Sequence, residues 1–201
     1  FRVSIAATGL VVILALMRID WNFRGKLRTC MLLGMINSGL PATLYSVAAQ
    51  ILPAGYSSIF NATTPLMGVL IGGLFFSEKL TAMKVTGVFL GLVGVGILTR
   101  AGPVAFNLEL LIGALSCLLA TTCYGFAGYL TRRWLDQEGG LDSRLAALGS
   151  MLGATLLLLP FFGYRVLTDP PASWGGASVW LSLLGLGLVC TAFAYILYFR
   201  L

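Results

Sequence analysis

The sequence contains no histidine and little charge of either sign. Only 10% of its 201 residues are charged, whereas 58% are hydrophobic. A soluble domain carries about 25% charged and about 45–50% apolar residues, so this chain has too little polar surface to face water on all sides. The missing histidine removes the commonest general base and metal ligand. The composition therefore predicts a polytopic, all-α membrane protein and argues against a water-soluble enzyme.

Carboxylates are absent from the middle of every apolar run. All seven acidic residues lie at the ends of these runs or between them: Asp20, Glu78, Glu109, Asp136, Glu138, Asp142 and Asp169. The four cysteines are Cys30, Cys117, Cys123 and Cys190, and none has the close spacing of a metal or redox pair. We expect no buried acid for a proton relay in this part of the protein, no metal, no cofactor and no enzymatic activity.

Hydrophobic runs predict seven membrane-spanning helices, each near the roughly 20 residues that cross a bilayer. The charge-free stretch from Thr29 to Ser77 is too long for one helix, and Leu52-Pro53-Ala54-Gly55 offers its one break. The first run ends in Leu16-Met17-Arg18, which is no signal-peptide cleavage site, so we expect a helix whose start is cut and chain ends that are internal to a longer protein. The predicted spans are 1–17, 30–50, 54–76, 82–99, 108–131, 143–162 and 175–199.

Basic residues predict the orientation. If the segment after the first span is cytoplasmic, that side holds ten of the 13 basic residues, and the other side holds three: Arg2, Arg100 and Arg165. This asymmetry follows the positive-inside rule. The net charge of +6 is thus a topology signal, and we expect no nucleic-acid partner. We expect a multi-pass protein of the cell inner (plasma) membrane.

Neutral polar residues recur every three or four positions within the predicted spans, so each set lies on one helix face. Small residues such as Gly68, Gly72, Gly87 and Gly91 favour helix packing. For the amide and phenol groups, packing and a substrate cavity are equally good interpretations, because these groups need partners or water in lipid. Pro41 and Pro65 lie inside spans, and kinked helices often line cavities. The candidate substrate-binding residues are Asn37, Tyr45, Asn61, Thr64, Thr121, Tyr124, Thr191 and Tyr195.

An internal repeat is suggested by laying residues 32–48 on residues 185–201, an offset of 153 residues. Leu33, Gly34, Leu44 and Tyr45 then match Leu186, Gly187, Leu197 and Tyr198. The matched segments run in opposite directions across the membrane under the predicted orientation. This is the arrangement of an inverted repeat, which many secondary transporters use.

The stretch from Ile51 to Thr99 resembles the EamA-type family of the drug/metabolite transporter superfamily. The matching features are the Leu-Pro-Ala-Gly entry, Asn61 to Pro65, Ser77-Glu78-Lys79-Leu80 and the glycine-rich run that follows. The resemblance implies ten helices in two inverted five-helix repeats around a central cavity. It assigns residues 1–100 to an N-terminal repeat lacking its first helix, and residues 108–201 to a C-terminal repeat lacking its last two.

These features predict a secondary transporter, an exporter of amino acids or related small metabolites that works by alternating access. The partners would be a small-molecule substrate and membrane lipid, and the oligomeric state stays open. A multidrug-type cation exporter is the first alternative, although no mid-span carboxylate is visible to bind a cation. A non-transporting membrane scaffold subunit is the second.

Overall fold

The computed structural model describes residues 1–101, 107–136, 141–170, 175–194 and 197, and within these residues every regular element is helical. Four helical segments of the described part are long and apolar enough to cross a membrane: Leu27–Ile51, Gly55–Phe75, Leu108–Leu135 and Ser143–Thr168. Three shorter apolar helices cover Arg2–Leu16, Ala82–Leu98 and Ala177–Phe193. These segments fall at the seven predicted positions, so the all-α, multi-pass architecture is confirmed.

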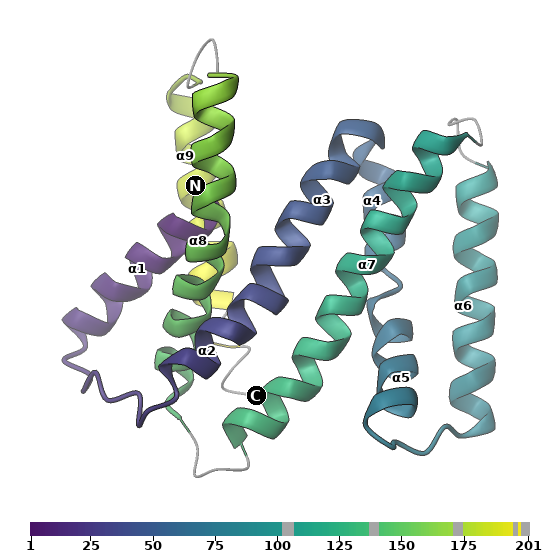
Figure 1. Cartoon of the computed structure of the whole chain (residues 1–201), viewed down its shortest axis with the longest axis horizontal. Coiled ribbons are helices and arrows are strands. Elements are labelled where there is room, and N and C mark those ends of the chain that lie inside the picture. Colours follow the sequence, from purple (N-terminus) through teal and green to yellow (C-terminus); the bar gives the residue numbers. More distant parts are fainter. Residues whose placement is uncertain (102–106, 137–140, 171–174, 195–196, 198–201) are drawn as a thin grey trace. The chain divides into compact units, whose positions relative to one another are not determined.

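The helical elements are α1 (Arg2–Leu16), α2 (Leu27–Gly34), α3 (Leu40–Ile51), α4 (Ala54–Asn61), α5 (Thr64–Phe75), α6 (Ala82–Ala101), α7 (Leu108–Thr131), α8 (Ser143–Thr168) and α9 (Ala177–Gly187) (Figure 1). Three π-helical turns extend them: η1 (Met35–Gly39), η2 (Arg132–Asp136) and η3 (Leu188–Phe193). The second predicted span is thus α2, η1 and α3 in succession. The third is divided into α4 and α5.

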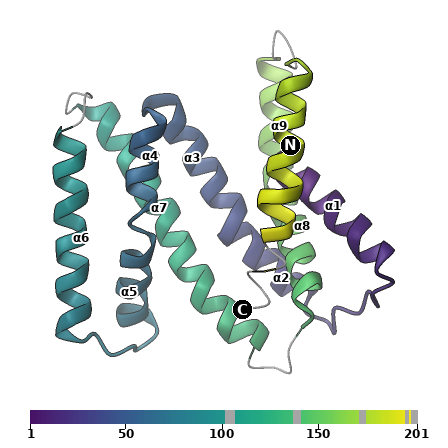
Figure 2. The same ribbon diagram turned by 180° about the vertical axis from the view of Figure 1, so that it is seen from behind.

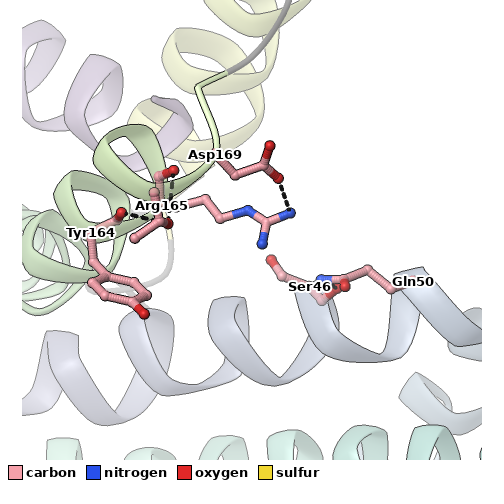
Figure 3. Close-up of polar contacts among 6 residues, drawn as sticks. Ser46, Gln50, Tyr164, Arg165 and Asp169 are labelled. Atoms are coloured by element: carbon pink, nitrogen blue, oxygen red, sulfur yellow. Dashed lines mark hydrogen bonds and ion pairs between the residues drawn. The ribbon is translucent and has the colours of Figure 1, made fainter.

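Helix α8 runs six residues beyond the predicted end at residue 162, because Pro160 does not terminate it. The helix ends at Thr168 and is capped by Asp169, whose N–H bonds to the Arg165 carbonyl at 2.9 Å and which precedes Pro170. Figure 3 shows Arg165 and Asp169 of the last turn, whose side chains form an ion pair with an N–O distance of 3.0 Å. In the same turn the Thr168 hydroxyl donates to the Tyr164 carbonyl at 2.9 Å. The same view shows Gln50 of α3, whose side-chain amide donates to the Ser46 carbonyl at 3.3 Å.

The chain forms two compact units. Unit 1 comprises Phe1–Gly39 and Trp134–Leu201, and unit 2 comprises Leu40–Arg133. The chain therefore passes from one unit to the other twice, once at the end of η1 and once within η2. These units are defined by packing, whereas the predicted repeats at 1–100 and 108–201 are defined by chain order. The two divisions are different, so the repeats stay a prediction.

Unit 1 is built on α8, which packs against α1, α2 and η1, while α9 and η3 pack against α1 (Figure 2). Its core is aliphatic and includes Leu10, Leu14, Leu148 and Met151, none of which has exposed surface above 1%. Burying such side chains together removes their entire apolar surface from the surroundings and fills the space between helices at native density. The apolar faces of α1 and α8 thus hold this unit together.

Unit 2 is built on α7, against which α3, α4 and α5 pack, while α6 packs against α4 and α5. Its core joins Ala48 and Leu52 to Tyr56, Phe60 and Cys117. Gly113 faces Leu52, and a Cβ at Gly113 would lie 2.5 Å from the Leu52 side chain, so any larger residue would require this side chain to shift. Most predicted polar candidates belong to this unit.

Candidate functional site

The predicted third span bends between α4 and α5, and local hydrogen bonds explain the position of the bend. The Phe60 carbonyl accepts both the Thr63 N–H at 3.0 Å and the Thr63 hydroxyl at 2.7 Å. Pro65 has no N–H to donate to the carbonyl of Asn61, four residues earlier. The Thr64 hydroxyl donates to that carbonyl instead, at 2.7 Å. The helix is interrupted at residues 62–63 (Figure 1). Just before this turn, the carbonyls of Phe60 and Asn61 accept hydrogen bonds from threonine hydroxyls.

This bend brings polar groups from several helices together. The Tyr45 hydroxyl of α3 donates to Asn61 Oδ1, at the end of α4, at 2.8 Å. The Tyr45 ring lies near the Tyr124 ring of α7, with centroids 6.4 Å apart and 28° between the planes. Four predicted candidates thus form what we call the polar cluster: Tyr45, Asn61, Thr64 and Tyr124. All four belong to unit 2.

A fifth candidate, Thr121, lies deeper in the same unit. Its hydroxyl donates to the Leu118 carbonyl at 2.9 Å and lies 3.3 Å from the hydroxyl of Thr63. Both threonines are fully buried. Thr63 was not among the predicted candidates. The one feature of the sequence that points to it is its position next to Thr64, which was predicted. The Thr63–Thr121 pair joins the bend to α7, and in this conformation neither side chain has surface to offer a ligand.

The remaining candidates lie in unit 1 or outside the described residues. Asn37 is half-buried in η1, next to the predicted kink at Pro41. Thr191 is buried in η3, where its hydroxyl donates to the Leu186 carbonyl five residues earlier at 2.8 Å. Tyr195 falls outside the described residues. The structure therefore groups Tyr45, Asn61, Thr64, Thr121 and Tyr124 in one unit, and their use by a substrate stays a prediction.

Sequence reasoning missed a second polar group at the other end of α5. Glu78 pairs with Lys84 at 3.3 Å, and its backbone N–H bonds to the Gly72 carbonyl at 3.0 Å past Ser77, which has a φ of 55°. The Tyr129 ring of α7 stacks on Phe76 with centroids 4.6 Å apart. A hydrogen bond from Tyr129, together with Lys84, lowers the pKa of the Glu78 carboxyl. No sequence spacing relates residues 78 and 129, so only the fold could reveal this contact.

The polar cluster can bind a molecule through hydrogen bonds and aromatic faces but not through an ion pair, because α3, α4 and α5 contain no charged residue. Glu109 lies in the first turn of α7, about four turns before Tyr124. Among the residues that the structure describes, no group of three or more metal-ligating side chains comes together. The groups present are uncharged hydrogen-bonding and aromatic side chains, and their use by a small polar molecule stays a prediction.

Comparisons with known proteins agree with this architecture. The EamA-like transporter family matches residues 1–100. A protein of Streptantibioticus cattleyicolor, described as a probable terminal-alkyne amino-acid exporter, is 27% identical over 146 residues, which cover 71% of this chain and 47% of the exporter. The chain thus spans about half the length of that curated relative.

One solved crystal structure of a protein superimposes with a TM-score of 0.71 over 98% of this chain and 66% of the solved chain. Its sequence identity of 19% supports the fold alone. The helical order and the family match lead to one conclusion: the chain belongs to the EamA-like transporter family.

Proposed function

We propose that the protein is a secondary transporter of the inner (plasma) membrane that exports amino acids or related small metabolites. The observation that carries this proposal is the polar cluster, in which α3, α4, α5 and α7 contribute uncharged polar groups at a bend inside a membrane span. Polar groups at such a bend are characteristic of substrate sites in transporters. The name of the Streptantibioticus cattleyicolor relative supports amino acids as the substrate class.

Alternating access requires two bodies that move against each other. Two features of this chain support alternating access. The chain divides into two compact units, and both connections between the units lie at π-helical turns. π-Helical turns interrupt the regular hydrogen-bond ladder and often occur at functional positions. A transport cycle of this kind needs no covalent chemistry, which is consistent with a family named for transport.

Flux into proteoliposomes tests the proposal. The full-length protein would be reconstituted, loaded with a panel of unlabelled amino acids and assayed for uptake of radiolabelled counterparts by exchange. We expect saturable exchange for a subset of amino acids, absent from protein-free vesicles. Exchange of organic cations alone would instead favour a multidrug-type exporter. No exchange of either class by folded protein would favour a scaffold subunit and refute the proposal.

A further inference from the structure

The hydroxyl protons around the bend are committed to partners inside the protein. Tyr45 donates to Asn61 Oδ1, and Thr64 donates to the Asn61 backbone carbonyl. Thr63 and Thr121 donate to the carbonyls of Phe60 and Leu118, at 2.7 and 2.9 Å. A hydroxyl has only one proton to give. These four groups therefore have no further donor for a ligand without breaking an existing bond.

Asn61 is the exception. Its Oδ1 accepts from the Tyr45 hydroxyl at 2.8 Å, so Nδ2, the other end of the amide, is directed away from that hydroxyl. The residue is exposed, and Nδ2 has no hydrogen-bond partner among the residues that the structure describes. A primary amide carries two N–H donors on this atom. The Asn61 amide nitrogen is therefore the donor in the polar cluster that is available to a ligand acceptor.

Charge then restricts the ligand. A molecule of net positive or negative charge would lose hydration without gaining an ion pair from α3, α4 or α5. A zwitterion also loses hydration, but its two charges attract each other and leave no net charge uncompensated. Its carboxylate can accept from the Asn61 amide, and its ammonium can lie against tyrosine ring faces, which attract cations. Tyr45, which bonds to Asn61, supplies one such face, and the Tyr124 ring, 6.4 Å from the Tyr45 ring centroid to centroid, supplies a second.

We propose that Asn61 Nδ2 binds the carboxylate of a net-neutral amino acid, with the ammonium group against Tyr45 and Tyr124. This inference rests on the proposed function and refines it, because it selects zwitterions over organic cations and organic anions. It also divides the roles within the cluster. Asn61 contacts the substrate, whereas Thr64 and the Tyr45 hydroxyl hold the Asn61 backbone and side chain in place.

The decisive variant is Asn61→Asp. It retains an oxygen that accepts from the Tyr45 hydroxyl, removes both N–H donors and adds a negative charge. Wild-type and variant full-length protein would be compared in proteoliposomes with leucine and phenylalanine, and with their primary amides, which are cations without a carboxylate. We expect Asn61→Asp to lower amino-acid flux at least about tenfold, as the loss of a hydrogen bond to a charged group predicts, and to raise the flux of the amides.

A matched control is Gln50→Glu, which makes the same amide-to-carboxylate change at an exposed residue of α3 whose side-chain amide donates to the Ser46 carbonyl within its own helix. It should leave the ratio of amino-acid to amide flux unchanged. If Asn61→Asp does not fold, Asn61→Ala removes both N–H donors without adding charge, and it should lower amino-acid flux while leaving amide flux unchanged.

The two proposals fail in different ways. Wild-type protein that exchanges neither amino acids nor amides refutes the proposed function and this inference with it. Wild-type protein that exchanges amino acids, with an unchanged amino-acid to amide ratio in the folded Asn61 variants, leaves the function standing and overturns the role of Asn61.

Discussion

Gly34 of α2 lies directly against the backbone carbonyl of Ser150 in α8, so that a Cβ at residue 34 would overlap it. The contact is mutual along the helix pair, because Gly153 of α8 lies in the same way against the backbone of Met31. The Ser150 hydroxyl also donates to the Cys30 carbonyl at 3.4 Å. Two glycines thus bring two helix backbones together, as is common where membrane helices pack.

Gly34→Ala should destabilise unit 1. The added methyl group meets backbone rather than a movable side chain, and overpacking of this kind costs about 1–3 kcal/mol. Thermal unfolding in detergent would measure the loss. Gly185→Ala is the control, because its added methyl group meets no atom within 4 Å and should change stability little. Equal melting temperatures for Gly34→Ala and wild type would contradict the backbone contact.

Gly34 has a counterpart in Gly187, 153 residues later. Gly187 of α9 packs against Ile5 and the Arg2 carbonyl of α1, which is the helix before α2. Gly34 of α2 packs in turn against α8, which is the helix before α9. The π-helical turns η1 and η3 begin at Met35 and Leu188, which are also 153 residues apart. A structural repeat would produce this correspondence at the offset that the sequence suggested. The opposite membrane orientation of the two copies remains a prediction.

Acid should weaken the contact between Glu78 and Tyr129. The pKa of Glu78 is lower in the folded protein than its usual value, so this carboxylate stabilises the fold above its usual pKa. That contribution is lost as the pH falls through the folded-state pKa. Tyr129→Phe removes the phenol that contributes most to the shift, and we expect its destabilising effect at neutral pH to shrink in acid. Thermal unfolding of wild type and Tyr129→Phe from neutral pH into acid would measure this change in the destabilising effect.

The matched control for that experiment is Tyr164→Phe, which removes an exposed phenol from α8. It should produce no pH-dependent difference from wild type. A Tyr129→Phe effect of the same size at every pH would contradict the role of Glu78.

Thr121 and Tyr124 lie within one turn of α7 but should respond differently to substitution. Thr121→Val removes a buried hydroxyl that bonds within the protein, so it should cost about 0.5–1.5 kcal/mol of stability. Tyr124→Phe alters a half-buried ring of the polar cluster and should reduce flux more than stability. Unfolding and proteoliposome flux would be measured on the same preparations. Normal flux with lost stability in Tyr124→Phe would assign that phenol to packing.

Topology can be tested by single-cysteine labelling in a background that lacks the four native cysteines. Lys26→Cys should be protected from impermeant reagent in intact cells, whereas Asp169→Cys should react, because the basic residues place position 26 in the cytoplasm. Asp169→Cys breaks only an exposed pair with Arg165, and such pairs contribute little to stability. Ready labelling at position 26 from outside would overturn the predicted orientation.

Apolar periodicity and length alone predicted the helices, because lipid requires every backbone group to be bonded within the segment. The span at 108–131 has the same limits as α7. Of the glycines predicted to pack helices, Gly72 faces the Tyr129 hydroxyl and Gly91 faces Leu66, whereas a Cβ at Gly68 or Gly87 would meet no atom within 4 Å. Pro65 indicated a distortion of the third span. It could not show that the helix breaks at residues 62–63, because this depends on which carbonyls the threonine hydroxyls reach.

The sequence placed Tyr45, Asn61 and Tyr124 on polar helix faces but could not say which faces meet, because period and spacing describe one helix at a time. Tertiary packing decided that α3, α4 and α7 share a unit, and so brought Tyr45 onto Asn61 and beside Tyr124. It also separated Asn37 and Thr191 from that unit and paired Glu78 with Tyr129. Local patterns determined which segments are helical, and contacts between residues distant in the sequence determined which polar groups act together.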